Sequence, residues 1–127
     1  MNVVPVIYAT KAKTYEMPGV SFKGLAAPQT GSKENSAWTF SLTPKSEGTL
    51  HQVTREEIMI ATKGKAYAEI GKEKFEFYAG DAIIIPPHTD FRLSNKSTEE
   101  FQGVALIPVG AQAVIGDEPP FTPPWTT

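Results

Sequence analysis

Hydrophobic and polar residues alternate with a period of two in several short segments of the chain. Residues 38–42 place tryptophan, phenylalanine and leucine on one face and small polar side chains on the other, and residues 66–70 show a similar alternation. This pattern is typical of β-strands that bury one face. Turn residues separate the segments about every eight to twelve residues, as in a sandwich or barrel. The pattern therefore predicts an antiparallel all-β domain.

The remaining strands are shorter or less regular. A helix at residues 56–63 is the competing interpretation, but Ile58, Ile60 and Thr62 are β-branched and Gly64 would end the helix early. No segment keeps a helical period for long, so we predict little or no helix, less than about a tenth of the chain. The predicted strands are at residues 3–8, 20–25, 38–42, 49–53, 58–62, 66–70, 74–78, 83–85, 91–93 and 101–108.

Proline and glycine interrupt the sequence near both ends. Residues 15–35 are therefore predicted to be mainly loop, with one short strand at 20–25, and the strand at 3–8 is predicted at an edge because it contains Pro5. The Pro-rich C-terminal segment with Trp125 is expected to form an extended tail that docks on the domain or on a neighbour. We predict a single domain over residues 1–127, with an irregular arm (1–35), a barrel core (36–108) and a tail (109–127).

The composition excludes several classes of function. The chain has 127 residues and no cysteine, so it has neither disulfides nor a thiol nucleophile. Its 12 basic and 14 acidic residues are scattered and give a formal charge of −2, which provides no basic stripe for nucleic acid. The N-terminal apolar run is too short and too broken by proline for a signal peptide or a membrane span. We expect a cytoplasmic protein that binds neither nucleic acid nor a membrane.

Two segments combine regular spacing with residue types that can carry chemistry. The first spans residues 51–64 and has the form His-Gln-Val, three residues, Glu, six residues, Gly, so that its notable positions are His51, Val53 and Glu57. The second spans residues 80–95 and has the form Gly, five residues, Pro-Pro-His, two residues, Phe, three residues, Asn, so that its notable positions are His88, Phe91 and Asn95. Asp81 and Asn95 are interpreted as turn-forming residues because Gly-Asp and Ser-Asn-Lys-Ser are common turn sequences.

These two segments resemble the two consecutive motifs of the cupin superfamily. The first family motif is Gly, five residues, His-x-His, three or four residues, Glu, six residues, Gly. The second is Gly, five residues, Pro-x-Gly, two residues, His, three residues, Asn. The spacings agree, and the resemblance implies a small antiparallel barrel of the jelly-roll type, with the two motifs joined by a hairpin at Gly71-Lys72.

The departures from the family pattern bear on the metal site. In metal-bearing cupins, two histidines and a glutamate of the first motif and the histidine of the second converge on one divalent ion. Here His51 and Glu57 keep ligand residue types, whereas Val53 and Phe91 cannot coordinate a metal. Two protein ligands are fewer than catalytic zinc and iron sites use. We therefore expect no metal and no other cofactor.

Two alternatives to this expectation remain open for the predicted site. A divalent metal would need His51, Glu57 and a third group such as His88 or Gln102. Without a metal, His51 and Glu57 could form an acid/base dyad, because a carboxylate among apolar side chains has a raised pKa and can exchange protons with an imidazole near neutrality. His51 could also be a purely structural interior histidine. The predicted pocket lining is Trp38, Phe40, Val53, Met59, Phe91 and Gln102.

Two classes of function follow from this site. The first is a binding module, in which a degenerate metal site lined by apolar side chains holds a small, partly apolar molecule. The second is an enzyme, either a metal-free isomerase, epimerase or cyclase that uses His51 and Glu57, or a weakly metal-dependent oxygenase or lyase. The apolar replacements favour the first. We also predict a homodimer, because apolar residues near both ends have no evident partner in one barrel: Val3, Val4, Ile7, Phe121 and Trp125.

Overall fold

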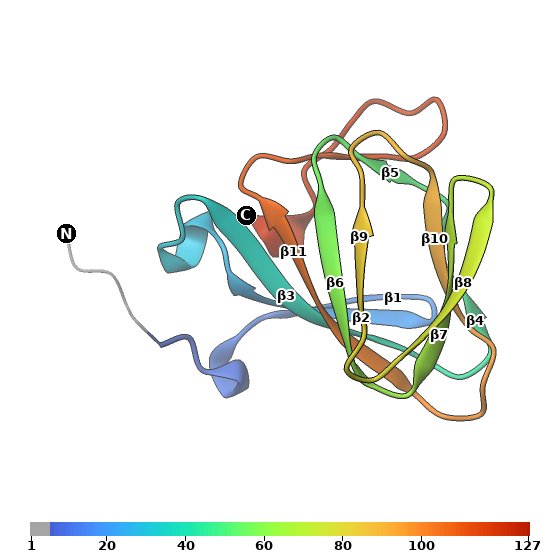
Figure 1. The fold of residues 1–127 in the computed structure, drawn as a ribbon. Helices are drawn as coiled ribbons and strands as arrows, with labels where there is room; N and C mark the ends of the chain where they lie inside the picture. The colour runs from blue at the N-terminus through green and yellow to red at the C-terminus, as the bar shows by residue number, and fades with distance from the viewer. Residues whose placement is uncertain (1–5) are drawn as a thin grey trace.

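The computed structural model describes residues 6–127 and contains two antiparallel sheets that face each other (Figure 1). One sheet has the strand order β1-β2-β3-β11-β6-β9, the other has the order β4-β10-β7-β8, and β12 pairs separately with β5. The strands are β1 (Thr14–Met17), β2 (Val20–Ala26), β3 (Asn35–Leu42), β4 (Ser46–Glu47), β5 (Gln52–Val53), β6 (Glu57–Lys63), β7 (Lys65–Ile70), β8 (Glu73–Tyr78), β9 (Ala82–Ile85), β10 (Phe91–Asn95), β11 (Phe101–Pro108) and β12 (Ala113–Val114).

Helix is confined to three single turns of 3-10 helix within residues 6–127. They are η1 (Ala9–Lys11), η2 (Pro28–Thr30) and η3 (Pro124–Thr126). The predicted all-β, jelly-roll-type barrel with little or no helix is therefore confirmed. None of the helices in this part of the chain is long and apolar enough to cross a membrane.

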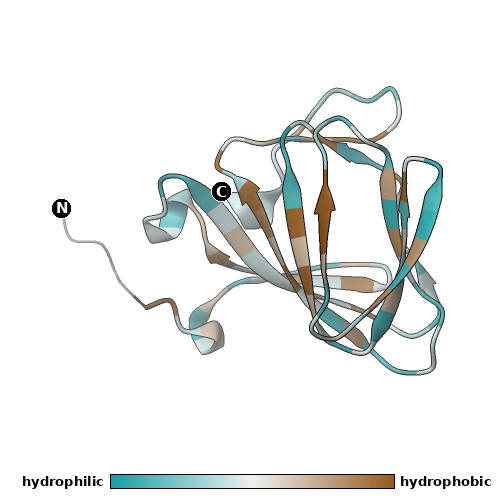
Figure 2. Ribbon diagram, in the orientation of Figure 1, coloured by the Kyte–Doolittle hydropathy of each residue, from teal (hydrophilic) through white to brown (hydrophobic). Residues whose placement is uncertain are grey.

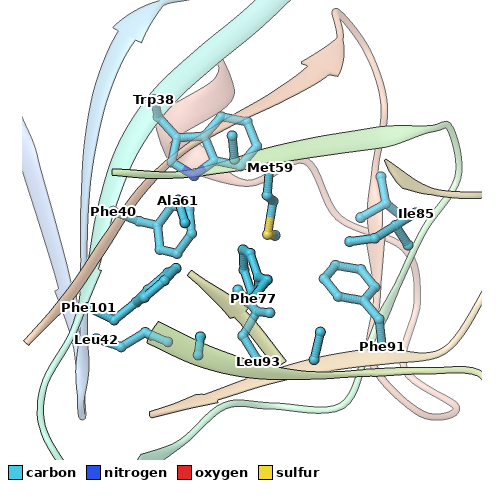
Figure 3. Close-up of a cluster of buried hydrophobic side chains, with 14 of the residues drawn as sticks. Trp38, Phe40, Leu42, Met59, Ala61, Phe77, Ile85, Phe91, Leu93 and Phe101 are labelled. Atoms are coloured by element: carbon cyan, nitrogen blue, oxygen red, sulfur yellow. The ribbon is translucent and has the colours of Figure 1, made fainter. Parts of the chain in front are cut away.

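The core lies between the two sheets because the alternation in the sequence directs one face of each strand inward. β3 and β11 pair along their full length, from Phe101 opposite Leu42 to Pro108 opposite Asn35, and buried residues alternate with half-buried ones on both strands. Figure 3 shows Trp38, Phe40 and Met59 from one sheet pointing toward side chains of the other. β9 is hydrophobic along its length (Figure 2), and as an edge strand it leaves Ile84 64% exposed.

The N-terminal arm is more regular than predicted. β1 and β2 form a hairpin around Gly19, whose φ of 79° is the left-handed conformation that suits glycine, and β2 pairs with β3. Pro18-Gly19 thus closes a hairpin instead of breaking a strand, so residues 14–17 form a strand where loop was predicted, and the strand predicted at 20–25 is present. The strand predicted at 3–8 lies partly outside the described residues, and its remaining residues 6–8 are not in a strand.

The C-terminal tail docks on its own barrel. The Trp125 ring stacks on Phe22 with centroids 3.8 Å apart and planes 3° apart, and the Ser36 hydroxyl donates a 2.7 Å hydrogen bond to the Thr126 carbonyl. A Cβ at Gly24 would lie 2.9 Å from the Trp125 carbonyl oxygen, so glycine permits this approach. Trp125 therefore has an intramolecular partner and no longer supports the homodimer. That assembly stays a prediction, and two of its residues, Val3 and Val4, lie outside the described part.

Candidate functional site

A cavity of about 480 Å³ lies between the two sheets. Its volume falls within the range of ~300–1,000 Å³ that small-molecule sites occupy. Most of its lining is apolar or aromatic, and it comes from the arm, the barrel core and the tail together. The aromatic and sulfur-containing side chains that line it are Tyr15, Met17, Phe22, Trp38, Phe40, Met59, Phe91, Phe121 and Trp125.

Glu57 enters this cavity because it is the first residue of β6, on the same face as Met59. The strand alternates, so that Glu57 and Met59 are buried while Ile58 between them is less so. Glu57 is only 3% exposed. No lysine or arginine lines the cavity within the described residues. Burial without a nearby cation raises the pKa of the Glu57 carboxyl to about 8. Glu57 is therefore predominantly a neutral carboxylic acid at pH 7.

His51 is held at the cavity wall by its backbone and by its ring. Its N–H and carbonyl both bond to Phe91, at 3.0 and 2.8 Å, and the two rings lie 4.2 Å apart between centroids. The ring Nδ1 lies 2.8 Å from the Thr49 carbonyl oxygen. Because a carbonyl only accepts hydrogen bonds, Nδ1 carries the proton and Nε2 is left as an acceptor. Burial lowers the pKa of His51, so that the imidazole is neutral at pH 7.

The two predicted catalytic residues line one cavity but are not hydrogen-bonded to each other in the described structure. At neutral pH the pair consists of an acid that can donate a proton and an imidazole nitrogen that can accept one. The arrangement can therefore form hydrogen bonds to polar groups of a ligand, or donate a proton to a ligand and remove one from it.

Five of the six predicted pocket residues line the cavity: Trp38, Phe40, Val53, Met59 and Phe91. Val53 and Phe91 are 6% and 1% exposed, so the interior position predicted for them is confirmed. Gln102 does not line the cavity, contrary to prediction. On β11 the buried positions begin with Phe101 and alternate, which turns Gln102 to the outer face, where its amide bonds to Glu100.

The metal ligands expected as an alternative are not brought together. His88 is exposed in the turn after β9, with a φ of 55°, and its N–H bonds to the Val53 carbonyl at 2.8 Å; it does not line the cavity. Within residues 6–127 no cluster of three histidine, cysteine, aspartate or glutamate side chains could hold a metal ion. Since Val53 and Phe91 fill two of the four family positions with buried apolar groups, the residues present do not fit the family's metal.

The two residues interpreted as turn-forming have that role in the structure. The Asn95 side chain is fully buried and accepts a 3.0 Å hydrogen bond from the Ser97 N–H while it donates a 2.8 Å bond to the Glu99 carbonyl. The Asp81 carboxylate accepts a 2.9 Å hydrogen bond from the Tyr78 N–H. The final asparagine of the second motif thus supports a turn and lies outside the cavity lining.

Sequence reasoning missed the cavity residues that come from the two ends of the chain. Tyr15 and Phe22 lie in the β1–β2 hairpin, and Phe121 and Trp125 lie in the tail. Phe22 sits two residues after Val20, and both line the cavity. That spacing of two was the signal within the predicted strand at 20–25. For Trp125, which stacks on Phe22, the sequence offered no such indication, because the tail has no periodic pattern of hydrophobic residues.

Comparison with known proteins supports the fold and leaves the activity open. A family model described as a cupin domain matches residues 38–107. A comparison with curated proteins finds no match. The polyketide cyclase RemF from Streptomyces resistomycificus has a similar structure, with a TM-score of 0.76 at 15% identity over 89% of this chain and 85% of that one.

Two other similar structures illustrate the range of proteins that share this fold. A sugar phosphate isomerase from Silicibacter pomeroyi has a TM-score of 0.72 at 15% identity over 90% of this chain and 83% of that one. The oxalate decarboxylase of Bacillus subtilis, which has Mn(II) centres, has a TM-score of 0.73 at 17% identity over 80% of this chain and 29% of that one. The family match covers more than half of the chain and includes both motifs, and the chain therefore belongs to the cupin domain family.

Proposed function

We propose that this protein binds a small, largely apolar molecule inside the barrel. The observation that carries the proposal is the cavity of about 480 Å³, whose lining is mainly apolar and aromatic. Burial of apolar surface stabilises such a complex by about 25 cal/mol per Å² before the costs of association are subtracted. The polar groups Glu57 and His51 supply orientation, as the few polar groups of small-molecule sites do.

The binding proposal is tested by narrowing the cavity from one wall. Val53→Phe adds a ring to a residue that lines the cavity, whereas Val104→Phe makes the same change on the outer face of β11. We expect the neutral dye N-phenyl-1-naphthylamine to bind the native chain and the Val104→Phe variant with similar affinity, and the Val53→Phe variant at least about tenfold more weakly. A fluorescence titration measures this, with circular dichroism to check folding. Equal binding to all three proteins would contradict an interior site.

A second candidate function is metal-free acid/base catalysis. It is favoured by one observation, that a buried carboxylic acid and a neutral imidazole line the same cavity and have opposite proton-transfer roles. Glu57 would protonate a carbonyl oxygen of the substrate while Nε2 of His51 removes a proton from the neighbouring carbon. The similar structures of a cyclase and an isomerase support this candidate only at the level of fold.

Hydrogen exchange at a ketone separates catalysis from binding. In deuterated buffer we expect the native chain to exchange the methyl protons of bound 2-acetylnaphthalene faster than buffer alone, because exchange at carbon needs the acid and the base together. The Glu57→Gln variant should bind the ketone and show only the buffer rate. Proton NMR follows the methyl signal. A native rate equal to that of buffer, with binding demonstrated, would favour the binding module over the enzyme.

A further inference from the structure

The cavity offers no positive charge to a ligand. No lysine or arginine lines it among the described residues, and the arginine adjacent to Phe91 in sequence is engaged outside it. This residue, Arg92, forms ion pairs with Glu47 at 2.8 Å and with Glu69 at 3.3 Å. An anionic ligand would therefore lose its hydration without gaining a counter-ion, which disfavours its binding.

The cavity does offer a buried hydrogen-bond donor in Glu57, in addition to the indole Nε1–H of Trp125, which is buried without a hydrogen-bond partner within residues 6–127. Glu57 is 3% exposed among apolar neighbours, and the titratable side chains that line the cavity with it are Tyr15, Glu16 and His51. In its neutral form a carboxylic acid presents an O–H that is costly to leave unpaired in a buried site. A carbonyl oxygen is the simplest uncharged partner for that O–H.

The walls of the cavity suit a planar ligand. Trp38 and Phe40 project from β3 and Phe91 projects from β10 of the opposite sheet, so that aromatic side chains face the space from two sides (Figure 3). Phe22 and Trp125 add a stacked pair at the end formed by the arm and the tail. Aromatic rings prefer offset-stacked or edge-to-face contacts with other rings, which add to simple area burial.

We propose that the ligand is an uncharged, planar aromatic or conjugated molecule with a carbonyl oxygen that accepts a hydrogen bond from Glu57. This inference rests on the binding function proposed above and narrows it to a chemical class. It places carboxylates and phosphates outside the range of ligands, since they would enter a cavity that has a carboxyl group and no cation. Nε2 of His51 can receive a second hydrogen bond from a ligand hydroxyl or N–H where one is present.

Three ligands of similar size test the proposal. They are 2-acetylnaphthalene, which has a carbonyl acceptor, 2-ethylnaphthalene, which has none, and 2-naphthoate, which is an anion. Quenching of tryptophan fluorescence at about pH 6.5 reports binding, because Trp38 and Trp125 line the cavity. We expect the ketone to bind the native chain at least about tenfold more tightly than either of the other two, as one hydrogen bond or one unpaired charge would cause.

Two substitutions identify the donor. Glu57→Gln keeps an N–H donor at this position and should keep the preference for the ketone over 2-ethylnaphthalene. Glu57→Met has a similar length without a donor and should lose that preference while it retains 2-ethylnaphthalene. If the methionine variant does not fold, the same titrations at about pH 9.5 decide the donor, because Glu57, whose pKa is about 8, has then lost its proton. The native chain should lose the preference for the ketone there, and the glutamine variant should keep it.

The outcomes distinguish this inference from the binding function on which it rests. If none of the three naphthalenes binds, the proposed function fails together with the inference. If all three bind with equal affinity, or if 2-naphthoate binds most tightly, binding stands and the neutral carbonyl class is overturned. If the preference for the ketone survives in Glu57→Met, Glu57 is not the donor and the inference is again overturned.

Discussion

The free energy of unfolding of the native chain should fall by roughly 3–5 kcal/mol as the pH rises from about 4.5 to about 8, through Glu57 alone. The pKa of Glu57 is raised by burial from 4.5 to about 8. Between these two values the unfolded chain releases a proton that the folded chain keeps. Because the folded chain keeps the proton more tightly than the unfolded chain, Glu57 favours the folded state at low pH. This contribution is lost as the pH rises toward the pKa of Glu57 in the folded state. Each pH unit in that window corresponds to about 1.4 kcal/mol.

The Glu57→Gln variant should lose this pH dependence, because glutamine does not titrate. Urea unfolding at about pH 5 and about pH 8 measures it, with Glu56→Gln as the matched control on the adjacent, exposed residue. His51 acts in the opposite direction, since burial lowers its pKa and its contribution is lost as the pH falls below about 6.5. The native chain and the Glu57→Gln variant both contain His51, so its contribution cancels when their free energies of unfolding are compared. If the two variants and the native chain changed in parallel with pH, Glu57 would not be buried as described.

The second large effect is expected from restoring the two missing family histidines. Val53→His plus Phe91→His would place two imidazoles at positions that line the same cavity as His51 and Glu57. Replacing the buried Phe91 should by itself destabilise the chain by about 3–5 kcal/mol. Zinc present at about 100 times its dissociation constant should then restore about 2.7 kcal/mol, because it binds the folded state. Thermal unfolding with and without zinc measures both the loss of stability caused by the substitutions and the stability regained when zinc binds.

The control for the restored site is the triple variant, which carries Glu57→Gln together with Val53→His and Phe91→His. It removes the carboxylate ligand but keeps three imidazoles, so zinc should bind it more weakly than the double variant. Elemental analysis after gel filtration gives the stoichiometry, expected to be one zinc per chain for the double variant. A folded double variant that takes up no zinc, nickel or iron would show that positions 51, 53, 57 and 91 do not converge.

The barrel core could be predicted because its strands follow a strict alternation. On β3 and β6 a spacing of two residues was enough to place Trp38 with Phe40, and Glu57 with Met59, on the inner face. The same reasoning would have excluded Gln102, had Phe101 been taken as the inward residue. Phe101 is fully buried, with its ring 5.9 Å from that of Phe40.

The ends of the chain could not be predicted in the same way. Residues of β2 are all half-buried, so their alternation is weak. A Pro-Gly sequence such as Pro18-Gly19 can either end a strand or form the turn of a hairpin, and the sequence alone does not distinguish the two. Trp125 finds its partner in Phe22, at the other end of the sequence. Local patterns hold no information on such a contact. The pKa of Glu57 likewise depends on burial by residues from several strands, which composition alone does not give.

The contact between arm and tail also bears on the order of events during folding. The hydrogen bond between Ser36 and Thr126 spans 90 residues, and the stack of Phe22 on Trp125 spans still more. Contacts over such separations form late, because the loop entropy is lost before the contact compensates for it. The hairpins of the core involve short loops and can form early. The local hairpins of a newly made chain would therefore be in register for some time before the chain can retain a ligand.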